Sequence, residues 1–118
     1  MLAGANVLRQ NTVIVHGTAL APEDAPRLAA ARASVAWCPE SDTRLYGRTA
    51  PVAALRDGGV SIGLGSDAPS AGARDALSNL AAARREGVLD DAALLRLATR
   101  DSAAVARFTP GGFEDAAP

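Results

Sequence analysis

The sequence predicts an α/β fold built from parallel βα units, and three observations predict it. Short β-branched or apolar runs alternate with longer segments of helical character. Glycine or proline ends most of these segments. The resulting order of strand, helix, strand, helix, strand and helices is typical of parallel sheets. With 118 residues, the chain is long enough for one small domain and one core.

The first βα unit is expected at the N-terminal end of the chain. The run TVIVHG at 12–17 is β-branched and ends at a glycine, which predicts a short buried strand. A helix is expected over 21–33, because Pro22 suits a first helical turn. Glu23 and Asp24 lie where the positive end of the helix dipole favours carboxylates.

The second and third strands are expected at 34–38, which reads SVAWC and stops before Pro39, and at 60–65, which reads VSIGLG. Between them, the long polar stretch 39–50 is interpreted as a functional loop or a surface excursion. A short helix over 51–59, ended by glycine, completes the unit.

Three helices are expected after the third strand, at 73–87, 90–100 and 101–108. The apolar side chains at helical spacing on the first of them form its expected core face: Leu77, Leu80 and Ala81. Residues 1–108 are therefore expected to form one domain. The remainder, 109–118, has turn residues and no pattern, and we expect a frayed tail.

Composition and charge exclude several classes of function. Twelve basic residues, all arginine, meet 13 acidic ones, and no basic stripe argues for nucleic acid as a partner. No apolar run approaches the roughly 20 residues of a membrane span, and no signal peptide is visible. The single cysteine, Cys38, excludes an internal disulfide and fits a cytoplasmic protein. Because aromatic residues are only 3%, the core must consist of Ala, Leu and Val.

Polar residues follow each predicted strand at its C-terminal end, the edge that carries active sites in parallel α/β folds. His16 follows the first strand and Asp67 the third. A third group follows the middle strand: Cys38, Glu40, Ser41 and Asp42. We expect His16 and Asp67 to lie on the same edge of one sheet.

Each of these residues also has a purely structural interpretation. Asp67 lies in Ser-Asp-Ala-Pro, which is good turn chemistry. His16 is equally compatible with a structural or exposed side chain, and Cys38 with a small core residue. Arg44 and Arg48 suit either an anionic substrate or plain surface exposure. The glycines at 63 and 65 do not make a dinucleotide fingerprint, because no third glycine opens a helix at the required spacing.

Three stretches of the chain resemble the amidohydrolase superfamily, and most closely its cytosine and guanine deaminases, adenosine-derivative deaminases and triazine chlorohydrolases. The resemblance covers residues 8–108 and rests on VIVHGTAL, VAWCPESDTRLYGRTAPVAALRDGGVSIGLGSD and LLRLATRDSAAVARF. It implies that the three strands are the last three of a metal-dependent (β/α)₈ barrel.

The resemblance also implies roles for individual residues. His16 matches the histidine that touches the substrate and helps polarise or protonate it, and Asp67 matches the aspartate that binds a divalent metal, zinc or iron, and acts as base for the attacking water. Ser41 and Asp42 match a Ser-Asn pair in many relatives, so Asp42 departs from the commoner residue. Together with Arg44, these two are expected to bind substrate.

The rest of the superfamily's metal ligands are missing, since the chain has one histidine and no His-x-His. A catalytic zinc site wants about three protein ligands. We therefore expect a C-terminal fragment of a hydrolase acting on C–N or C–Cl bonds of small cyclic substrates, inactive alone and binding no metal stably. The alternatives are a non-catalytic truncated product, a subunit that completes a barrel, or a binding module using 39–50.

The predicted sheet has two lateral edges, at 12–16 and 60–65, and each offers unpaired backbone groups beside apolar side chains. We therefore expect self-association, or a partner chain that completes the barrel.

Overall fold

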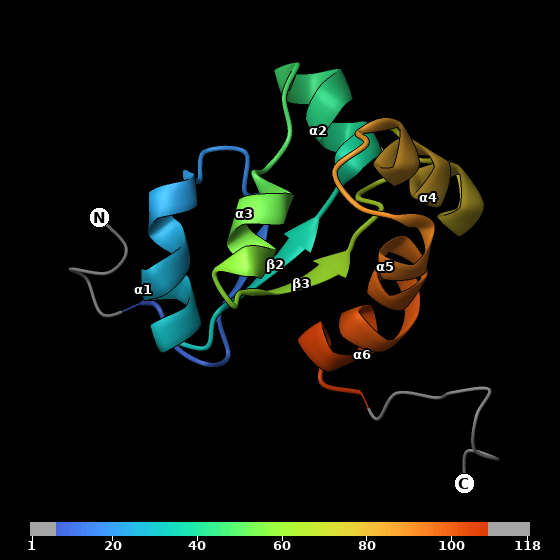
Figure 1. Ribbon diagram of the computed structural model, residues 1–118. Coiled ribbons are helices and arrows are strands. Elements are labelled where there is room, and N and C mark those ends of the chain that lie inside the picture. Colours follow the sequence, from blue (N-terminus) through green and yellow to red (C-terminus); the bar gives the residue numbers. More distant parts are fainter. Residues whose placement is uncertain (1–6, 109–118) are drawn as a thin grey trace, which may run out of the picture.

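Three short strands form a parallel sheet in the order β1-β2-β3 (Figure 1). They are β1 (Val13–Val15), β2 (Ser34–Trp37) and β3 (Ser61–Leu64). Both pairs of neighbours are parallel. This computed structural model describes residues 7–108, and the predicted tail 109–118 lies outside the described residues. The predicted α/β fold with a parallel sheet is confirmed.

Helical segments follow each strand: η1 (Pro22–Asp24), α1 (Ala25–Ala30), α2 (Pro39–Tyr46), α3 (Val52–Asp57), α4 (Ala76–Arg85), α5 (Asp91–Arg96), η2 (Leu97–Asp101) and α6 (Ser102–Val105). The helix expected over 21–33 is divided into the 3₁₀ turn η1 and the short helix α1. The division falls near Pro26, which has no N–H to donate to the preceding turn. η2 is a π-helical turn that continues α5 into α6.

The stretch expected to be a loop at 39–50 is instead largely helical, and that prediction was wrong. Pro39 begins α2, where its fixed φ suits the first turn. Glu40 and Asp42 follow in the same turn, and Gly47 ends the helix in the left-handed conformation at φ 66°. The polar composition therefore reflects a helix that stands over the end of the sheet, as Figure 1 shows.

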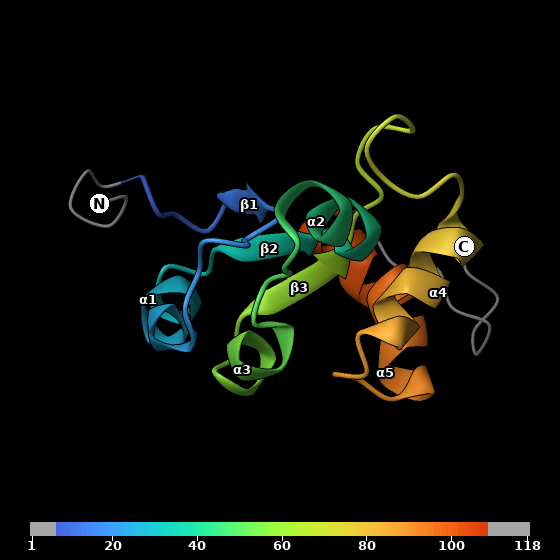
Figure 2. The same ribbon diagram turned by 90° about the horizontal axis from the view of Figure 1, so that it is seen from above.

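One face of the sheet forms the core with α1 and α3, which lie side by side beneath it in Figure 2. On this face Ile14, Val35 and Ile62 stand in register across the three strands. Trp37, two residues after Val35, has no exposed surface. The remaining core consists of small and aliphatic residues, as the composition predicted, among them Ala25, Leu28, Val52, Leu55, Leu94 and Leu97.

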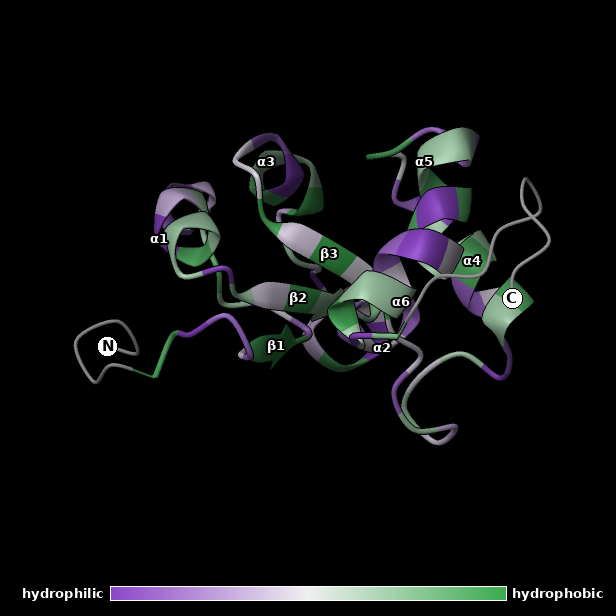
Figure 3. Ribbon diagram, turned by 90° about the horizontal axis from the view of Figure 1, so that it is seen from below, coloured by the Kyte–Doolittle hydropathy of each residue, from purple (hydrophilic) through white to green (hydrophobic). Residues whose placement is uncertain are grey.

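The two lateral edges of the sheet differ (Figure 3). At the β1 edge, Val13 and Val15 are 40% and 56% exposed. At the β3 edge, the Leu64 N–H donates to the Ser102 hydroxyl of α6 at 2.8 Å. The expectation of an open edge therefore holds at β1 and fails at the Leu64 end of β3.

Gly63 allows α6 to lie this close to β3. A Cβ at Gly63 would come within 3.0 Å of the Ser102 Cα and 3.3 Å of the Val105 Cβ. Any larger residue would push α6 away from the strand.

The face of α4 that packs inward is the expected one only at Leu80, which is partly buried against the core. Leu77 is 79% exposed and Ala81 is exposed, while the buried side chains are those of Asn79, Ala82 and Ala83. The core side of α4 therefore combines the small residues Ala82 and Ala83 with the partly buried Leu80. None of the helices within residues 7–108 is both long and apolar enough to cross a membrane.

Candidate functional site

His16 and Asp67 stand at the same edge of the sheet: His16 directly follows β1, and Asp67 lies in the turn after β3, which ends at Leu64. Both have left-handed backbones, with φ of 69° and 61°. The backbone N–H of His16 donates to the carbonyl of Ala36 at 2.9 Å, which anchors the turn to β2. The predicted placement of these two residues on one edge is confirmed, and left-handed turns at both strand ends are the kind of backbone that gathers at functional sites.

One side of the His16 ring faces a buried carboxylate. The Nδ1 atom lies 2.8 Å from Oδ1 of Asp42, a side chain with no exposed surface. The other oxygen of Asp42 accepts a hydrogen bond from the Thr49 hydroxyl at 3.0 Å. The indole N–H of Trp37 in turn donates to Thr49 at 2.5 Å. Asp42, in the first turn of α2, is thus fixed by His16 on one side and, through Thr49, by Trp37 of the core on the other.

The other side of the ring faces Asp67. The distance from His16 Nε2 to Oδ2 of Asp67 is 3.6 Å. The same carboxylate oxygen accepts a hydrogen bond from the buried Ser41 hydroxyl at 2.5 Å, and its partner oxygen accepts from the Ala68 N–H at 2.7 Å. Four residues predicted as site residues therefore form one cluster: the hydrogen-bonded pairs His16–Asp42 and Ser41–Asp67, joined by the 3.6 Å contact between His16 and Asp67.

The two carboxylates have opposite electrostatic environments. Burial raises the pKa of Asp42, opposed by its hydrogen bonds from His16 and Thr49. The hydrogen bond from Ser41, followed by that from the Ala68 N–H, lowers the pKa of Asp67. Asp67 is therefore ionised throughout the neutral range and keeps a side chain that is 26% exposed.

Cys38 belongs to the core beneath this cluster. Burial raises the pKa of its thiol to about 11, so the thiolate is scarce at neutral pH. A Cβ at Gly65 would come within 2.9 Å of the Cys38 sulfur, which shows how closely β3 passes over it. Both facts favour the structural interpretation of Cys38.

Arg44 lies apart from the cluster, on the exposed side of α2. It lines a hollow of about 310 Å³ between α2 and α4 together with Glu40 and Arg85. Arg85 and Glu40 form an ion pair there at 2.7 Å. A substrate contact by Arg44 stays a prediction, as do the substrate contacts expected of Ser41 and Asp42.

Three residues near the cluster were missed by the sequence analysis, namely Trp37, Thr49 and Asn79. Thr49 and Trp37 connect to Asp42 only through the folding of α2 over β2. Asn79, which is 3% exposed, donates from Nδ2 to the Gly65 carbonyl at 2.7 Å, while its Oδ1 has no partner among the described residues. It lines a cavity of about 240 Å³ together with Ser66 and Asp67. A buried asparagine on a predicted helix is the one pattern that could have drawn attention to it.

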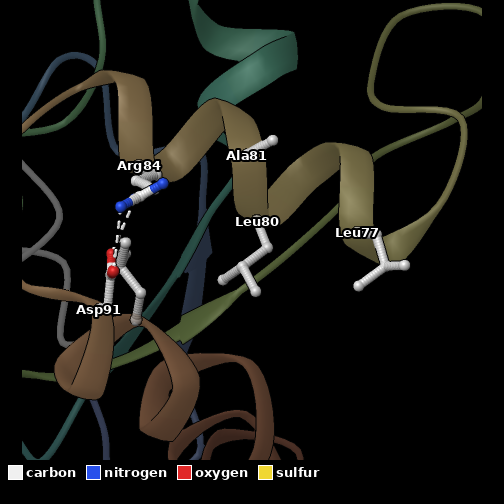
Figure 4. A pocket seen from close by; sticks show the side chains of 6 residues that line it. Leu77, Leu80, Ala81, Arg84 and Asp91 are labelled. Carbon is white, nitrogen blue, oxygen red and sulfur yellow. Dashed lines mark hydrogen bonds and ion pairs between the residues drawn. The ribbon is translucent and has the colours of Figure 1, made fainter.

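A separate hollow of about 300 Å³ lies between α4 and α5. Figure 4 shows Leu77 and Leu80 beside it, with Arg84 reaching Asp91 across its end. That ion pair spans 2.8 Å and neutralises the charged lining residues. The hollow therefore offers apolar surface and no reactive group, and the chemistry belongs to the strand-end cluster.

The cluster fits part of a metal site. A carboxylate and an imidazole, here Asp67 and His16, are both ligand types that zinc accepts. Within residues 7–108, however, no group of three or more His, Cys, Asp or Glu side chains is placed to hold one metal ion. The described residues therefore contain fewer donors than a catalytic zinc requires.

Comparison with protein families and curated proteins identifies relatives. The model of the amidohydrolase family matches residues 2–112. The 5-methylthioadenosine/S-adenosylhomocysteine deaminase of Halobacterium salinarum is 34% identical over 111 residues, which cover 93% of this chain and 25% of that protein. The deaminase of the same name from Teredinibacter turnerae is 38% identical over 89 residues, or 75% of this chain and 20% of that protein. The chain thus spans about a quarter of the length of such relatives.

Solved structures give the same fold. An adenosine deaminase from Xanthomonas campestris with bound zinc matches 91% of this chain and 26% of its own, at 29% identity and a TM-score of 0.71. Atrazine chlorohydrolase from Arthrobacter aurescens, complexed with zinc, matches 88% of this chain and 25% of its own, at 25% identity and a TM-score of 0.69. Guanine deaminase from E. coli matches 94% of this chain and 27% of its own, at 22% identity and a TM-score of 0.78, a likeness of fold alone.

Proposed function

Because the chain belongs to the amidohydrolase family, we propose that its strand-end cluster is one part of a metal-dependent site that hydrolyses a C–N bond of a small cyclic substrate and releases an amine or ammonia. The observation that carries this proposal is the placement of His16 and Asp67 at one edge of the sheet, with Nε2 and Oδ2 3.6 Å apart. Two groups at this distance can act on the same bound molecule.

Deamination is favoured over dechlorination by the relatives. Curated proteins 34% and 38% identical to this chain are named as deaminases of 5-methylthioadenosine and S-adenosylhomocysteine. The chlorohydrolase likeness is weaker, at 25% identity. An amino-substituted purine nucleoside is therefore the first substrate class to test.

Asp67 is the residue that would hold the metal, zinc or iron. When bound, such a metal lowers the pKa of its water towards ~7 and makes hydroxide available. Asp67 is suited to accept the proton of the attacking water, because the hydrogen bond from Ser41 keeps the pKa of this carboxyl low and the side chain ionised. Its partial exposure leaves it accessible to that water.

His16 would contact the substrate through Nε2, since Nδ1 is occupied by Asp42. An imidazole in this position can exchange a hydrogen bond with a ring nitrogen or with the leaving group. The buried Ser41 fixes the carboxylate of Asp67 relative to the ring. These three residues account for binding and proton transfer on this side of the site.

The remaining ligands would come from polypeptide outside residues 7–108, in this or another chain. We therefore propose that the described part is inactive by itself and completes a barrel supplied elsewhere. The alternative is a non-catalytic binding module, which would use the same edge without a metal.

Fragment complementation tests the proposal. The Halobacterium deaminase without the quarter that this chain matches would be mixed with the chain, zinc and 5-methylthioadenosine, and ammonia release would be measured. Activity is expected with the unaltered chain and with Asp57→Ala, a change of an exposed residue that ends α3 just before β3 begins, at the opposite end of the sheet. Asp67→Ala and His16→Ala are expected to lose at least 100-fold, the size typical of losing a general acid or base.

Zinc binding gives a readout independent of turnover. Titration calorimetry is expected to show tighter zinc binding by the mixture than by either piece, and Asp67→Ala is expected to remove the difference. Equal binding and activity with Asp67→Ala would refute the proposal. Substrate bound by the chain alone in the presence of a chelator would favour the binding module.

A further inference from the structure

The imidazole of His16 meets one carboxylate at each ring nitrogen, and the two contacts differ in kind. Nδ1 lies at hydrogen-bond distance, 2.8 Å, from Asp42. Nε2 lies 3.6 Å from Asp67, beyond a normal hydrogen bond. Asp42 has no exposed surface, so it cannot reach a substrate placed above the sheet edge. Any effect of Asp42 on chemistry must therefore pass through His16.

The hydrogens in this chain of contacts can be assigned from one end. The Trp37 indole N–H is only a donor, so Thr49 accepts from it. The hydroxyl hydrogen of Thr49 is then free to go to Oδ2 of Asp42, 3.0 Å away. An ionised carboxylate only accepts, and so Oδ1 must receive a hydrogen from Nδ1 of His16. This arrangement satisfies each polar atom in the series, and the backbone N–H of Ala50 is a further donor to Asp42.

We propose that Asp42 is a positioning residue that holds the neutral imidazole of His16 in the tautomer protonated at Nδ1. Nε2 then presents a lone pair to the open side, where Asp67 lies. A substrate N–H or water O–H placed there meets an acceptor. The catalytic meaning of this rests on the proposed function, whereas the tautomer itself is measurable without any substrate or metal.

The exchange of aspartate for asparagine matters at this position, because an amide can accept through its oxygen or donate through its nitrogen. In Asp42→Asn, Thr49 still has a hydrogen to donate. The amide satisfies it by turning its oxygen toward Thr49 and its NH₂ toward Nδ1. The imidazole must then carry its hydrogen on Nε2, the opposite tautomer, in a side chain of the same shape.

Nitrogen NMR can read this directly, because the chain has a single histidine. Long-range ¹H–¹⁵N correlation of the uniformly labelled chain, at an alkaline pH where the spectrum no longer changes, would give one pair of ring-nitrogen signals. The unaltered chain is expected to show a pyrrole-type Nδ1 and a pyridine-type Nε2. Asp42→Asn is expected to exchange the two types.

Two further variants separate positioning from a general disturbance of the site. Ser41→Ala alters the neighbouring residue and the contact to Asp67, and is expected to leave the tautomer unchanged. The double variant Asp42→Asn with Thr49→Val removes one of the two donors that orient the amide, the other being the Ala50 backbone N–H, and is expected to move both ¹⁵N shifts part of the way back.

A pyridine-type Nδ1 in the unaltered chain would overturn the proposal, as would an unchanged pattern in Asp42→Asn. A change of tautomer in Ser41→Ala would equally contradict it, since the tautomer would then depend on Asp67. These outcomes are independent of the complementation assay. If the complementation assay shows no activity while NMR shows the expected tautomer, the proposed function is refuted and the role of Asp42 as a positioning residue stands.

Discussion

Two aspartates face the same imidazole from opposite sides, and their surroundings make them different groups. Asp42 sits in the first turn of α2, buried beneath His16, and burial raises its pKa. Asp67 sits in the turn after β3, partly exposed, and the hydrogen bond from Ser41 lowers its pKa. The comparison shows that position in the fold, and not residue type, separates a carboxylate that supports the site from one able to react in it.

The largest effect on stability is expected from removing the imidazole of His16, which contacts both Asp42 and Asp67. His16→Ala is expected to lower the free energy of unfolding by about 3 kcal/mol, because it leaves Asp42 buried without its partner. In an Asp42→Asn background the same change should cost about 2 kcal/mol less. Urea unfolding followed by circular dichroism of the four proteins measures this coupling. A coupling near zero would mean that Asp42 does not depend on His16.

Thr49→Val removes one of the hydrogen bonds that hold Asp42, the buried one of the two aspartates, and leaves the contacts of Asp67 unchanged. The expected loss is about 2 kcal/mol, because the indole N–H of Trp37 and one oxygen of Asp42 lose their partner. Thr43→Val is the matched control on the exposed side of α2, where the hydroxyl contacts only Glu86, and should change stability by less than about 0.5 kcal/mol. Equal losses in both variants would contradict the buried chain of hydrogen bonds.

The pH dependence of unfolding should have opposite signs for the two carboxylates. Because the folded pKa of Asp42 is raised, its contribution to stability grows as pH falls from its folded pKa toward the ordinary value near 3.9. Because the folded pKa of Asp67 is lowered, its contribution is present above about 3.9 and is lost as pH falls through the folded pKa. Urea unfolding between pH 3 and 7, in roughly half-unit steps across that window, would measure Asp42→Asn and Asp67→Asn against the unaltered chain. Differences of the same sign would refute the contrast.

The smallest effect on stability is expected from Asp67→Asn at neutral pH. The carboxylate lies at the open edge, and asparagine tolerates the left-handed backbone there. The midpoint of urea unfolding should therefore fall only slightly, by the small contribution that the hydrogen bonds from Ser41 and Ala68 make to the ionised carboxylate, while zinc binding in the complemented mixture is lost. A clear loss of stability would show that Asp67 is a structural turn residue, the interpretation its Ser-Asp-Ala-Pro context also allows.

The sequence predicted the parts of the fold that depend on local pattern. The three strands and their parallel order follow from β-branched runs between helical segments, and the strand-end places of His16 and Asp67 follow with them. The helix α2 was missed, because the polarity of 39–50 outweighed the Pro39 and Gly47 signals that begin and end it. The links from Trp37 through Thr49 to Asp42 join residues 12 and 7 positions apart, and no periodicity predicts such contacts.

The difference between the two edges of the sheet limits how many copies of the chain can associate through their strands. A sheet with two open sides can add neighbours on both and extend without limit, in the manner of an open filament. Within residues 7–108, the Ser102 hydroxyl and α6 lie beside the Leu64 end of β3, whereas β1 presents an uncovered row beside Val13 and Val15. Two copies joined β1 to β1 by a twofold axis would use up both uncovered rows. Association through strands would therefore close at a pair, and a separate barrel piece would compete with the second copy for the same place.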